Sequence, residues 1–308
     1  MSSNAGTIKI VEVGPRDGLQ NESKILPPSD RIQLIEKLVD AGLRFLEGGS
    51  FVSPKAIPQM ENSEQVWEVL SGKIPEEIDL SFLVANEKGL ERATKVGVKS
   101  IAVFTATSDA FTQKNINRTV MESINDFRPI VKAGKAAGMR VRGYVSTVFG
   151  CPYEGRQPIE KIVEVADALL KMGCDEISLG DTIGVAHPRQ IKEVLSRLRS
   201  VLPMARLAGH FHDTRGMALM NIRAAADEGV RIFDSSVSGL GGCPYAPGSS
   251  GNVATEEVVW MLEGFGFHTG VDVEKLLTLG EWLEAKLARP MRGRLFQSKP
   301  KLLNYFEA

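Results

Sequence analysis

The chain has 308 residues, of which 43% are hydrophobic, 24% charged and 6% aromatic, which excludes a largely disordered or fibrous protein. Its 37 basic and 38 acidic residues leave a net charge of −1, so no global field draws nucleic acid or an anionic membrane surface to it. No apolar run approaches the ~20 residues of a membrane span, so neither nucleic acid nor membrane is expected as a partner.

Short β-branched segments alternate with longer segments of helical periodicity along most of the chain. Successive strands begin about 32 residues apart on average, close to the ~30 residues of a β-α-β unit. The eight expected strands begin near Ile8, Arg44, Asp79, Ser100, Arg140, Cys174, Arg206 and Arg231.

The segments between these strands carry the residues that begin and end helices. Residues 158–173, for example, open with Pro158 at a first-turn position and end at Gly173. Similar segments follow the other strands, and one more helix is expected over residues 272–288, beyond the eighth unit.

Eight such units could form either a doubly wound open sheet or a closed barrel. The Gly-rich nucleotide-binding turn of the open sheet is missing, because the turn after the first strand reads GPRDGLQNE. We therefore predict a single (β/α)8 TIM barrel with one additional C-terminal helix. The short tail over residues 289–308 is typical of either a surface arm or an interface element.

The N-terminus and the cysteines indicate the compartment. The first residues contain neither a basic-then-apolar signal nor an Arg-rich leader, so a cytoplasmic protein is expected. Cys151, Cys174 and Cys243 are widely spaced and form neither a disulfide framework nor a paired zinc motif. This pattern fits a reducing compartment, in which a functional cysteine acts as a thiol.

Polar residues stand at the carboxyl ends of the expected strands, where barrels of this kind carry their catalytic groups. They come from distant parts of the chain and would meet on one rim. These residues are Arg16, Asp17, Glu47, Ser146, Thr147, Asp181, His210, His212 and Asp213, together with Cys243 and Asn252 after the eighth strand.

His210 and His212 form the clearest pattern, because alternate residues of a strand share one face. With Asp17 and Asn252 as oxygen ligands, the two imidazoles would suit an octahedral divalent cation with positions open to water or substrate. The alternative is a pair of ordinary hydrogen-bonded histidines in a polar rim, and the motif alone leaves both open. The metal site is favoured because the chain has only four histidines and this pair lies at a strand end.

Each of the carboxylates at the rim also has a simpler interpretation. Arg16 and Asp17 lie in a turn-rich segment, and Arg16 with Glu47 would form an ordinary ion pair. In the functional interpretation, Glu47 instead holds the guanidinium toward a developing oxyanion. Asp181 either caps the turn of its GDTIG segment or accepts a hydrogen bond from a histidine.

Cys243 lies in the most glycine-rich stretch of the chain, SGLGGCPYAPGSSGN. This stretch is too long for a simple turn and is typical of a mobile loop over a barrel mouth. A cysteine there is a candidate acid, base or nucleophile. A phosphate-binding role for the glycines stays open, although the Walker ending is absent. Asn252, taken alone, is interpreted more simply as a helix N-cap.

Seven segments of the chain resemble 3-hydroxy-3-methylglutaryl-CoA lyases, and the similarity runs from about residue 8 to about residue 288. The GLGGCPYA segment is specific to that family, whereas RDG and His-x-His are shared by other metal-dependent Claisen-type barrels. The segments are VEVGPRDGLQNE (11–22), SFVSPKAIPQM (50–60), FTQKNIN (111–117), RGYVSTVFGCPYEG (142–155), EISLGDTIGVAHP (176–188), HFHDTRG (210–216) and SVSGLGGCPYAPGSSGNVATE (236–256).

The resemblance implies a pyruvate-carboxyltransferase-like catalytic barrel over residues 1–288, with residues 289–308 as a separate tail. Its reaction would cleave 3-hydroxy-3-methylglutaryl-CoA to acetyl-CoA and acetoacetate, as in leucine degradation and ketone-body formation. A homodimer is also expected. The residues that the resemblance assigns to Mg²⁺ or Mn²⁺ are Asp17, His210, His212 and Asn252.

The resemblance also assigns roles in catalysis. Asp17, assisted by His210, would remove the proton of the substrate hydroxyl. Arg16, positioned by Glu47, would stabilise the enolate oxygen. Cys243 would protonate the carbanion under a closed loop. Asp181 would support a metal-binding histidine, and the candidates for the CoA phosphates are Lys24, Lys55 and Lys114.

Several positions depart from the family pattern. Gly48-Gly49 replaces an expected Ala-Thr next to Glu47, and Arg215 and Met217 follow the HFHDT segment. These changes could admit a different acyl group. Ser23 stands where the family often has Lys, and the tail has no cysteine, so the thiol regulation of animal members does not transfer.

Three alternatives remain. The same mechanism could act on a related 3-hydroxyacyl-CoA, such as citramalyl-CoA or a branched hydroxyglutaryl-CoA. A Claisen synthase of the isopropylmalate type shares the RDG and His-x-His elements, but usually has further C-terminal domains and leaves Cys243 unexplained. A non-catalytic metal- or CoA-binding protein is least favoured, because acid, base and oxyanion groups are all present.

Overall fold

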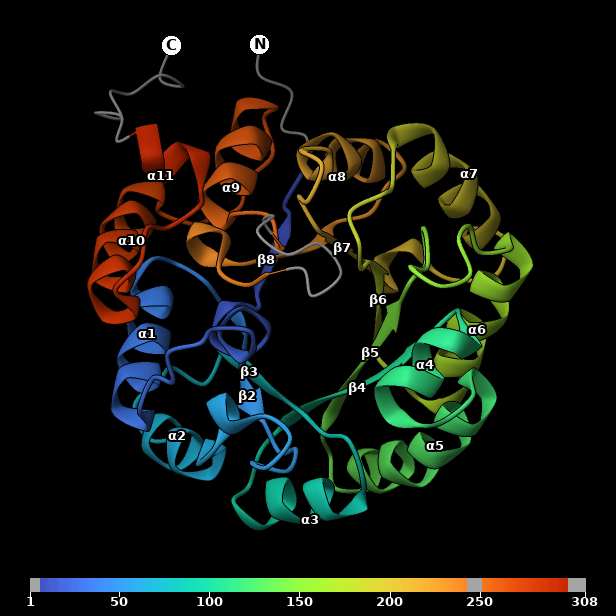
Figure 1. The fold of residues 1–308 in the computed structure, drawn as a ribbon, viewed down its shortest axis with the longest axis horizontal. Coiled ribbons are helices and arrows are strands. Elements are labelled where there is room, and N and C mark those ends of the chain that lie inside the picture. The colour runs from blue at the N-terminus through green and yellow to red at the C-terminus, as the bar shows by residue number, and fades with distance from the viewer. Residues whose placement is uncertain (1–5, 243–250, 299–308) are drawn as a thin grey trace.

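The computed structural model describes residues 6–242 and 251–298. Its eight parallel strands close into a barrel in sequence order (Figure 1), which confirms the predicted (β/α)8 fold. Each strand lies within two residues of its expected start. The strands are β1 (Lys9–Glu12), β2 (Phe45–Ser50), β3 (Asp79–Leu83), β4 (Ser100–Ala106), β5 (Arg140–Ser146), β6 (Glu176–Asp181), β7 (Leu207–Phe211) and β8 (Ile232–Ser235).

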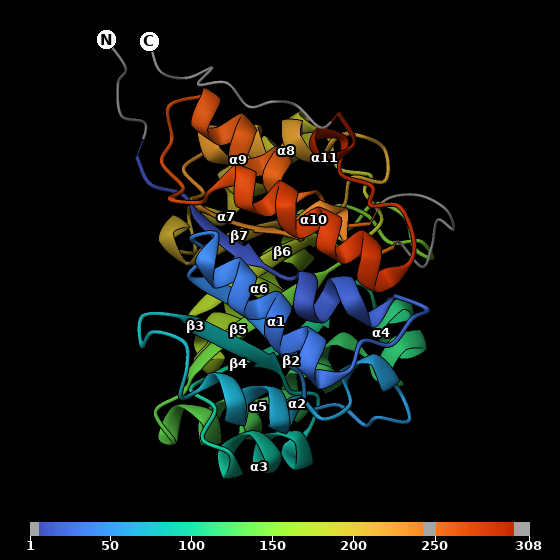
Figure 2. The ribbon, with the colours of Figure 1, turned by 90° about the vertical axis from the view of Figure 1, so that its left-hand side faces the viewer.

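The helices form a ring around this barrel (Figures 1 and 2). None of them, within the described residues, has the length and apolarity needed to cross a bilayer. They are α1 (Pro28–Asp40), α2 (Ser63–Leu70), α3 (Glu87–Lys95), α4 (Asp109–Ile116), α5 (Val120–Ala136), α6 (Ile159–Met172), α7 (Pro188–Leu198), α8 (Ala218–Asp227), α9 (Thr255–Gly264), α10 (Val273–Leu287) and α11 (Arg294–Ser298).

Local sequence explains where individual helices begin and end. Thr119 and Glu122 form a reciprocal capping box at the start of α5, which satisfies backbone N–H groups that have no partner inside the helix. Gly173 ends α6 with a φ of 115°, a left-handed conformation that glycine adopts without steric cost. The predicted helix over residues 158–173 is therefore confirmed to within one residue at its start.

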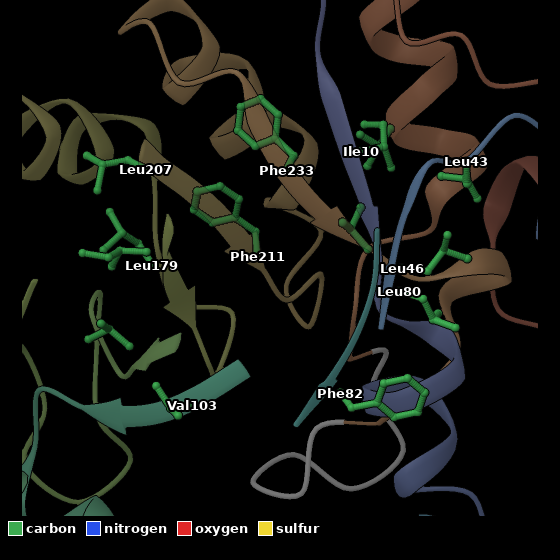
Figure 3. Packing of buried hydrophobic residues seen from close by; sticks show 14 of the residues in the cluster. Ile10, Leu43, Leu46, Leu80, Phe82, Val103, Leu179, Leu207, Phe211 and Phe233 are labelled. Atoms are coloured by element: carbon green, nitrogen blue, oxygen red, sulfur yellow. The ribbon is translucent and has the colours of Figure 1, made fainter. Parts of the chain in front are cut away.

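Alternation along the strands separates an apolar layer from a polar barrel interior. Phe211 and Phe233, from the paired strands β7 and β8, belong to the buried cluster between the barrel and the helices (Figure 3). His210, next to Phe211 on the same strand, points into the barrel and lies 3.2 Å from Asp234. Because the interior is polar at these positions, the strand ends present ionisable groups rather than core side chains.

The beginning of the C-terminal tail packs against the barrel. Residues 294–298 form α11, and the buried Phe296 lies close to Gly280 of α10. Arg294 pairs with Asp213 and Glu257. These contacts exclude a free surface arm over residues 289–298, while the predicted domain boundary after residue 288 stays a prediction.

Candidate active site

A cavity of about 330 Å³ opens at the carboxyl ends of the strands. Apolar side chains, including Leu83, Phe104 and Phe111, form part of its wall. A larger groove of about 540 Å³ beside α3 and α5 contains none of the predicted site residues. The polar side chains of the cavity at the strand ends include Arg16, Asp17, Ser146, Thr182, His210 and His212.

The turn after β1 places Arg16 and Asp17 in this cavity. Residues Gly14–Gly18 form a single π-helical turn, η1. A Cβ atom on Gly14 would lie 2.5 Å from Glu12 Oε1, and one on Gly18 would lie 2.9 Å from Leu240 Cβ. Only glycine fits at these positions, so the GPRDG sequence lets the turn pack tightly against the end of the barrel.

Arg16 forms the predicted ion pair with Glu47. Its Nε and Nη2 lie 2.9 and 2.6 Å from Glu47 Oε2, and its Nη1 lies 2.8 Å from Asp17 Oδ1. Burial alone would lower the pKa of Arg16, but Glu47 and Asp17 outweigh it and raise this pKa. The guanidinium therefore stays cationic, with its plane held by two carboxylates at the edge of the cavity.

The four predicted metal ligands come together in the structure. Donor atoms of Asp17, His210 and His212 all lie within 4.8 Å of one another. Asn252 Nδ2 lies 2.8 Å from Asp17 Oδ2, and its backbone forms a bridge with His212. The simpler interpretation of Asn252 as a helix N-cap is wrong, because Ala254 occupies that position of α9.

The residues of this group fit a divalent cation. Nδ1 of His212 is buried and has no hydrogen-bond partner among the described residues. Burial, with His210 nearby, lowers the pKa of His212 to about 4, so its imidazole is neutral and able to bind a metal at neutral pH. A carboxylate, an amide and two imidazoles are a donor set that suits an octahedral cation.

Asp234 is a site residue that the sequence reasoning missed. Its Oδ2 lies 3.2 Å from His210 Nδ1 and accepts a hydrogen bond from Ser178 at 2.9 Å. Its Oδ1 accepts one from Arg142 at 2.5 Å. Burial would raise the pKa of Asp234, but Arg142 and His210 lower it to about 2. The sequence signal was an aspartate at an inward position of the eighth strand, beside the outward-facing Phe233.

Asp181 has the turn role that the sequence left open for it. Its two carboxylate oxygens accept hydrogen bonds from the backbone N–H groups of Val185 and Ala186, at 2.9 and 3.0 Å. Burial nevertheless raises the pKa of Asp181 to about 6. In the described part of the chain neither oxygen is hydrogen-bonded to a histidine, so its predicted support of a metal ligand stays a prediction.

Of the other predicted rim residues, some line the cavity and others lie behind it and hold its loops. Ser146 lines the cavity. Thr147 is buried with a φ of 59°, and its N–H donates to the hydroxyl of Thr182, a cavity residue that the sequence reasoning missed. The Asp213 carboxylate accepts a hydrogen bond at 3.0 Å from the N–H of Ala218, the first residue of α8. Thr147 and Asp213 therefore support the loops rather than the cavity wall.

The predicted general acid, Cys243, lies outside the described residues, although Gly242 before it lines the cavity. The three lysines proposed for the CoA phosphates are all exposed. Their role stays a prediction. They are Lys24, Lys55 and Lys114, and the last lies over the ring of Tyr153.

The departures from the family pattern do not line the cavity. A Cβ atom on Gly48 would meet Leu80 and Phe82 at 2.8 and 2.9 Å, which places this glycine against the outer apolar layer. Arg215 donates to the backbone carbonyl of Ile183 at 2.6 Å. The lining described above also lacks Gly49 and Met217, so these changes do not alter the cavity wall directly.

The fold and the site define a TIM-barrel enzyme of the Claisen type, with a candidate metal site at Asp17, His210 and His212 beside a carboxylate-held arginine. The model of the HMGL-like family matches residues 7–283, and the chain belongs to this family.

Curated relatives and solved structures match over nearly the whole chain. The mitochondrial hydroxymethylglutaryl-CoA lyase of Bos taurus is 49% identical over 98% of this chain and 93% of its own. The enzyme of Pseudomonas mevalonii is 48% identical over 93% and 95%. A crystal structure of the Pseudomonas aeruginosa lyase superposes with a TM-score of 0.92 at 46% identity, covering 95% of this chain and 97% of that one.

A further similar structure contains coenzyme A. It is an HMG-CoA lyase from Acinetobacter baumannii in complex with coenzyme A and 3-methylmalate. This structure superposes with a TM-score of 0.91 at 35% identity and covers 98% of both chains.

Proposed function

We propose that the protein is a carbon–carbon lyase that cleaves 3-hydroxy-3-methylglutaryl-CoA to acetyl-CoA and acetoacetate. The observation that carries the proposal is the convergence of Asp17, His210 and His212 beside the Arg16–Glu47 pair in one cavity. The full-length similarity to hydroxymethylglutaryl-CoA lyases supports it.

The first step removes the proton of the substrate's tertiary hydroxyl. Asp17, His210, His212 and Asn252 would hold Mg²⁺ or Mn²⁺, which supplies positive charge where the alkoxide develops. Burial would raise the pKa of Asp17, but Arg16 and the two histidines lower it. Asp17 is therefore ionised at neutral pH and can accept the proton.

The second step breaks the carbon–carbon bond. The electrons of the alkoxide form the ketone of acetoacetate, and the bonding pair moves to the thioester side as an enolate. The Arg16 guanidinium is the cation at the cavity that stabilises the enolate oxygen, and its bonds to Glu47 hold it in place before the reaction. A thiol proton from Cys243 then completes acetyl-CoA.

The apolar part of the wall assists this chemistry. Leu83, Phe104 and Phe111 reduce the access of water to the cavity, and a dry cavity strengthens the electrostatic effect of Arg16 on the enolate. It also limits protonation of the carbanion by bulk water. The acyl group of the substrate occupies the cavity while CoA extends toward the barrel mouth.

A related substrate is the second candidate, because the Acinetobacter baumannii structure contains 3-methylmalate. The same steps would cleave a 3-methylmalyl or citramalyl thioester. Against it, the residues that motivated a substrate change, Gly48-Gly49, Arg215 and Met217, do not line the cavity. The hydroxymethylglutaryl thioester is therefore preferred.

The test measures acetoacetate and acetyl-CoA released from purified protein with Mg²⁺, with Mn²⁺ and with EDTA, over a panel of 3-hydroxyacyl-CoA thioesters. Metal-dependent release of acetoacetate is expected, together with its loss in Asp17→Asn and Cys243→Ala. Cleavage of another thioester without acetoacetate would favour the second candidate. Full activity of Cys243→Ala would exclude that thiol as the acid.

The compartment and the assembly are separate predictions. A homodimer is expected and would be seen by light scattering during size-exclusion chromatography. A cytoplasmic location is expected and would be seen by fractionation of cells that express the protein.

A further inference from the structure

A continuous set of buried polar groups runs through the barrel beneath the candidate metal site. Arg142 of β5 lies between Glu176 of β6 and Asp234 of β8, with Nε 2.9 Å from Glu176 Oε1 and Nη2 2.5 Å from Asp234 Oδ1. The second Asp234 oxygen contacts Ser178 and His210. Asp234 is therefore the one carboxylate, within the described residues, that connects this interior network to a predicted metal ligand.

Asp234 contacts Nδ1 of His210. This leaves the other ring nitrogen, Nε2, for a metal. A neutral imidazole carries one N–H, and a hydrogen-bond acceptor at one ring nitrogen keeps the proton there and leaves the lone pair on the other. Asp234 Oδ2 faces Nδ1 at 3.2 Å. Nε2, on the far side of the ring, is then available to a cation.

We propose that Asp234 is a positioning residue that keeps His210 in its Nδ1–H tautomer and directs Nε2 toward the cation held with Asp17 and His212. This inference rests on the proposed function for the presence of the cation. It assigns to Asp234 the support of a metal ligand that the sequence reasoning assigned to Asp181.

The surroundings of the two carboxylates explain this choice. Both Asp181 oxygens are occupied by backbone N–H groups, and a carboxylate bound in this way holds its loop. Asp234 has one oxygen on Arg142 and the other shared by Ser178 and His210. Its position is set by side chains from three neighbouring parts of the barrel.

Arg142 makes this arrangement rigid. It also donates from Nη1 to Tyr144 Oη at 3.0 Å, so its guanidinium is held by contacts from several strands. A buried carboxylate without a cation nearby is strongly unfavourable, and the guanidinium offsets this cost for Asp234. Groups held by strands keep a ligand in orientation better than groups on loops.

The test is Mn²⁺ binding, measured by calorimetry without substrate, in wild type, Asp234→Asn and the matched variant Asp181→Asn. Removing a carboxylate that supports a metal-binding histidine weakens binding by about 10- to 100-fold, so this loss is expected for Asp234→Asn and a much smaller one for Asp181→Asn. If Asp234→Asn binds Mn²⁺ as tightly as wild type, the role given to Asp234 is wrong, while the proposed metal site is unaffected. A wild-type protein that binds no Mn²⁺ would overturn the metal site as well.

A second measurement does not depend on the stability of any Asp234 variant. Long-range proton–nitrogen NMR spectra of wild-type protein with ¹⁵N-labelled histidine rings report the tautomer of each neutral imidazole. The chain has only four histidines, so single His→Gln variants suffice to assign His210. The Nδ1–H tautomer is expected for His210 in the metal-free protein, and the Nε2–H tautomer would overturn the inference.

Discussion

Buried charge occurs at both ends of the same barrel, in two clusters that differ in the space they enclose. At the carboxyl ends of the strands, the mouth cluster consists of Arg16, Asp17, Glu47, His210 and His212. At the opposite ends, the base cluster consists of Lys9, Asp79, Arg140, Arg142 and Glu176.

The base cluster is closed. Glu176 alone contacts Lys9 at 2.8 Å, Arg140 at 2.7 Å and Arg142 at 2.9 Å. The space left among these residues is only about 10 Å³. Opposite charges therefore compensate one another and seal the end of the barrel, as expected of a structural ion-pair network.

The mouth cluster surrounds an open cavity of about 330 Å³. Within the described residues, Glu47 Oε1 and His212 Nδ1 are buried without a hydrogen-bond partner. A buried polar atom with no partner is unfavourable unless a ligand completes its bonding. Arg142 Nε and Glu176 Oε1 of the base cluster are also buried without a hydrogen bond in the described part of the chain. The comparison therefore teaches that the same residue types form a support at one end and a binding site at the other, and that the open cavity distinguishes the two.

The largest expected effect is on kcat, which should fall for a change in the mouth cluster and not for one in the base cluster. Arg16→Gln removes the cation at the enolate oxygen and should lower kcat by about 10³-fold or more, as the loss of an oxyanion donor does. Arg140→Gln is the matched change in the base cluster and should leave kcat near the wild-type value. Steady-state kinetics on both purified variants decide the matter, and a near-normal kcat for Arg16→Gln would remove Arg16 from the mechanism.

The next effect is on the free energy of unfolding and concerns the base cluster. Glu176→Gln leaves three cations without their shared carboxylate and should lower the free energy of unfolding by about 3–5 kcal/mol, the cost of breaking a buried ion pair. Urea unfolding followed by circular dichroism measures this change. Arg118 pairs with Asp126 on the surface, so Asp126→Asn is the exposed control and should leave the free energy of unfolding nearly unchanged.

Most of the correct predictions rest on short-range patterns in the sequence. The strands follow from alternation and spacing, and the strand ends of a barrel meet on one rim whatever their separation in the chain. Asp17, His210, His212 and the Arg16–Glu47 pair could therefore be placed together without coordinates.

The misses depend on three-dimensional contacts and exact element boundaries, which short-range patterns do not report. Asp234 and Arg142 are 92 residues apart, and a lone aspartate in a strand gives no indication of a buried guanidinium beside it. Asn252 was open to interpretation as an N-cap because α9 begins only three residues later, at Thr255. The glycines after Glu47 lie close to the site along the chain, yet Gly48 packs outward against Phe82.

Metal binding should sharpen the comparison through thermal stability. Mn²⁺ at about 100 times its dissociation constant should stabilise the wild-type protein by about 2.7 kcal/mol, because it binds only the folded state. His212→Gln removes a ligand of the mouth cluster and should lose this stabilisation, whereas Arg140→Gln should keep it. Melting curves with Mn²⁺ and with EDTA provide the measurement, and an equal gain in all three proteins would argue against a site at His212.

The smallest expected effect concerns Gly49, at the irregularity of β2 next to Glu47. A Cβ atom there would lie 2.6 Å from Ser63 Oγ and 2.7 Å from Arg31 Nη2, so Gly49→Ala should lower the free energy of unfolding by about 1–3 kcal/mol through overpacking. Gly72→Ala is the control, because a Cβ atom at Gly72 meets nothing within 4 Å.

If Gly49 acts through packing, Gly49→Ala should keep the substrate preference of wild type in a competition between two 3-hydroxyacyl-CoA thioesters. A changed preference without loss of stability would mean that this position reaches the acyl group. Glu47 would then connect the packing behind β2 to the chemistry at Arg16. In that case a residue outside the mouth cluster, Gly49, would influence the reaction.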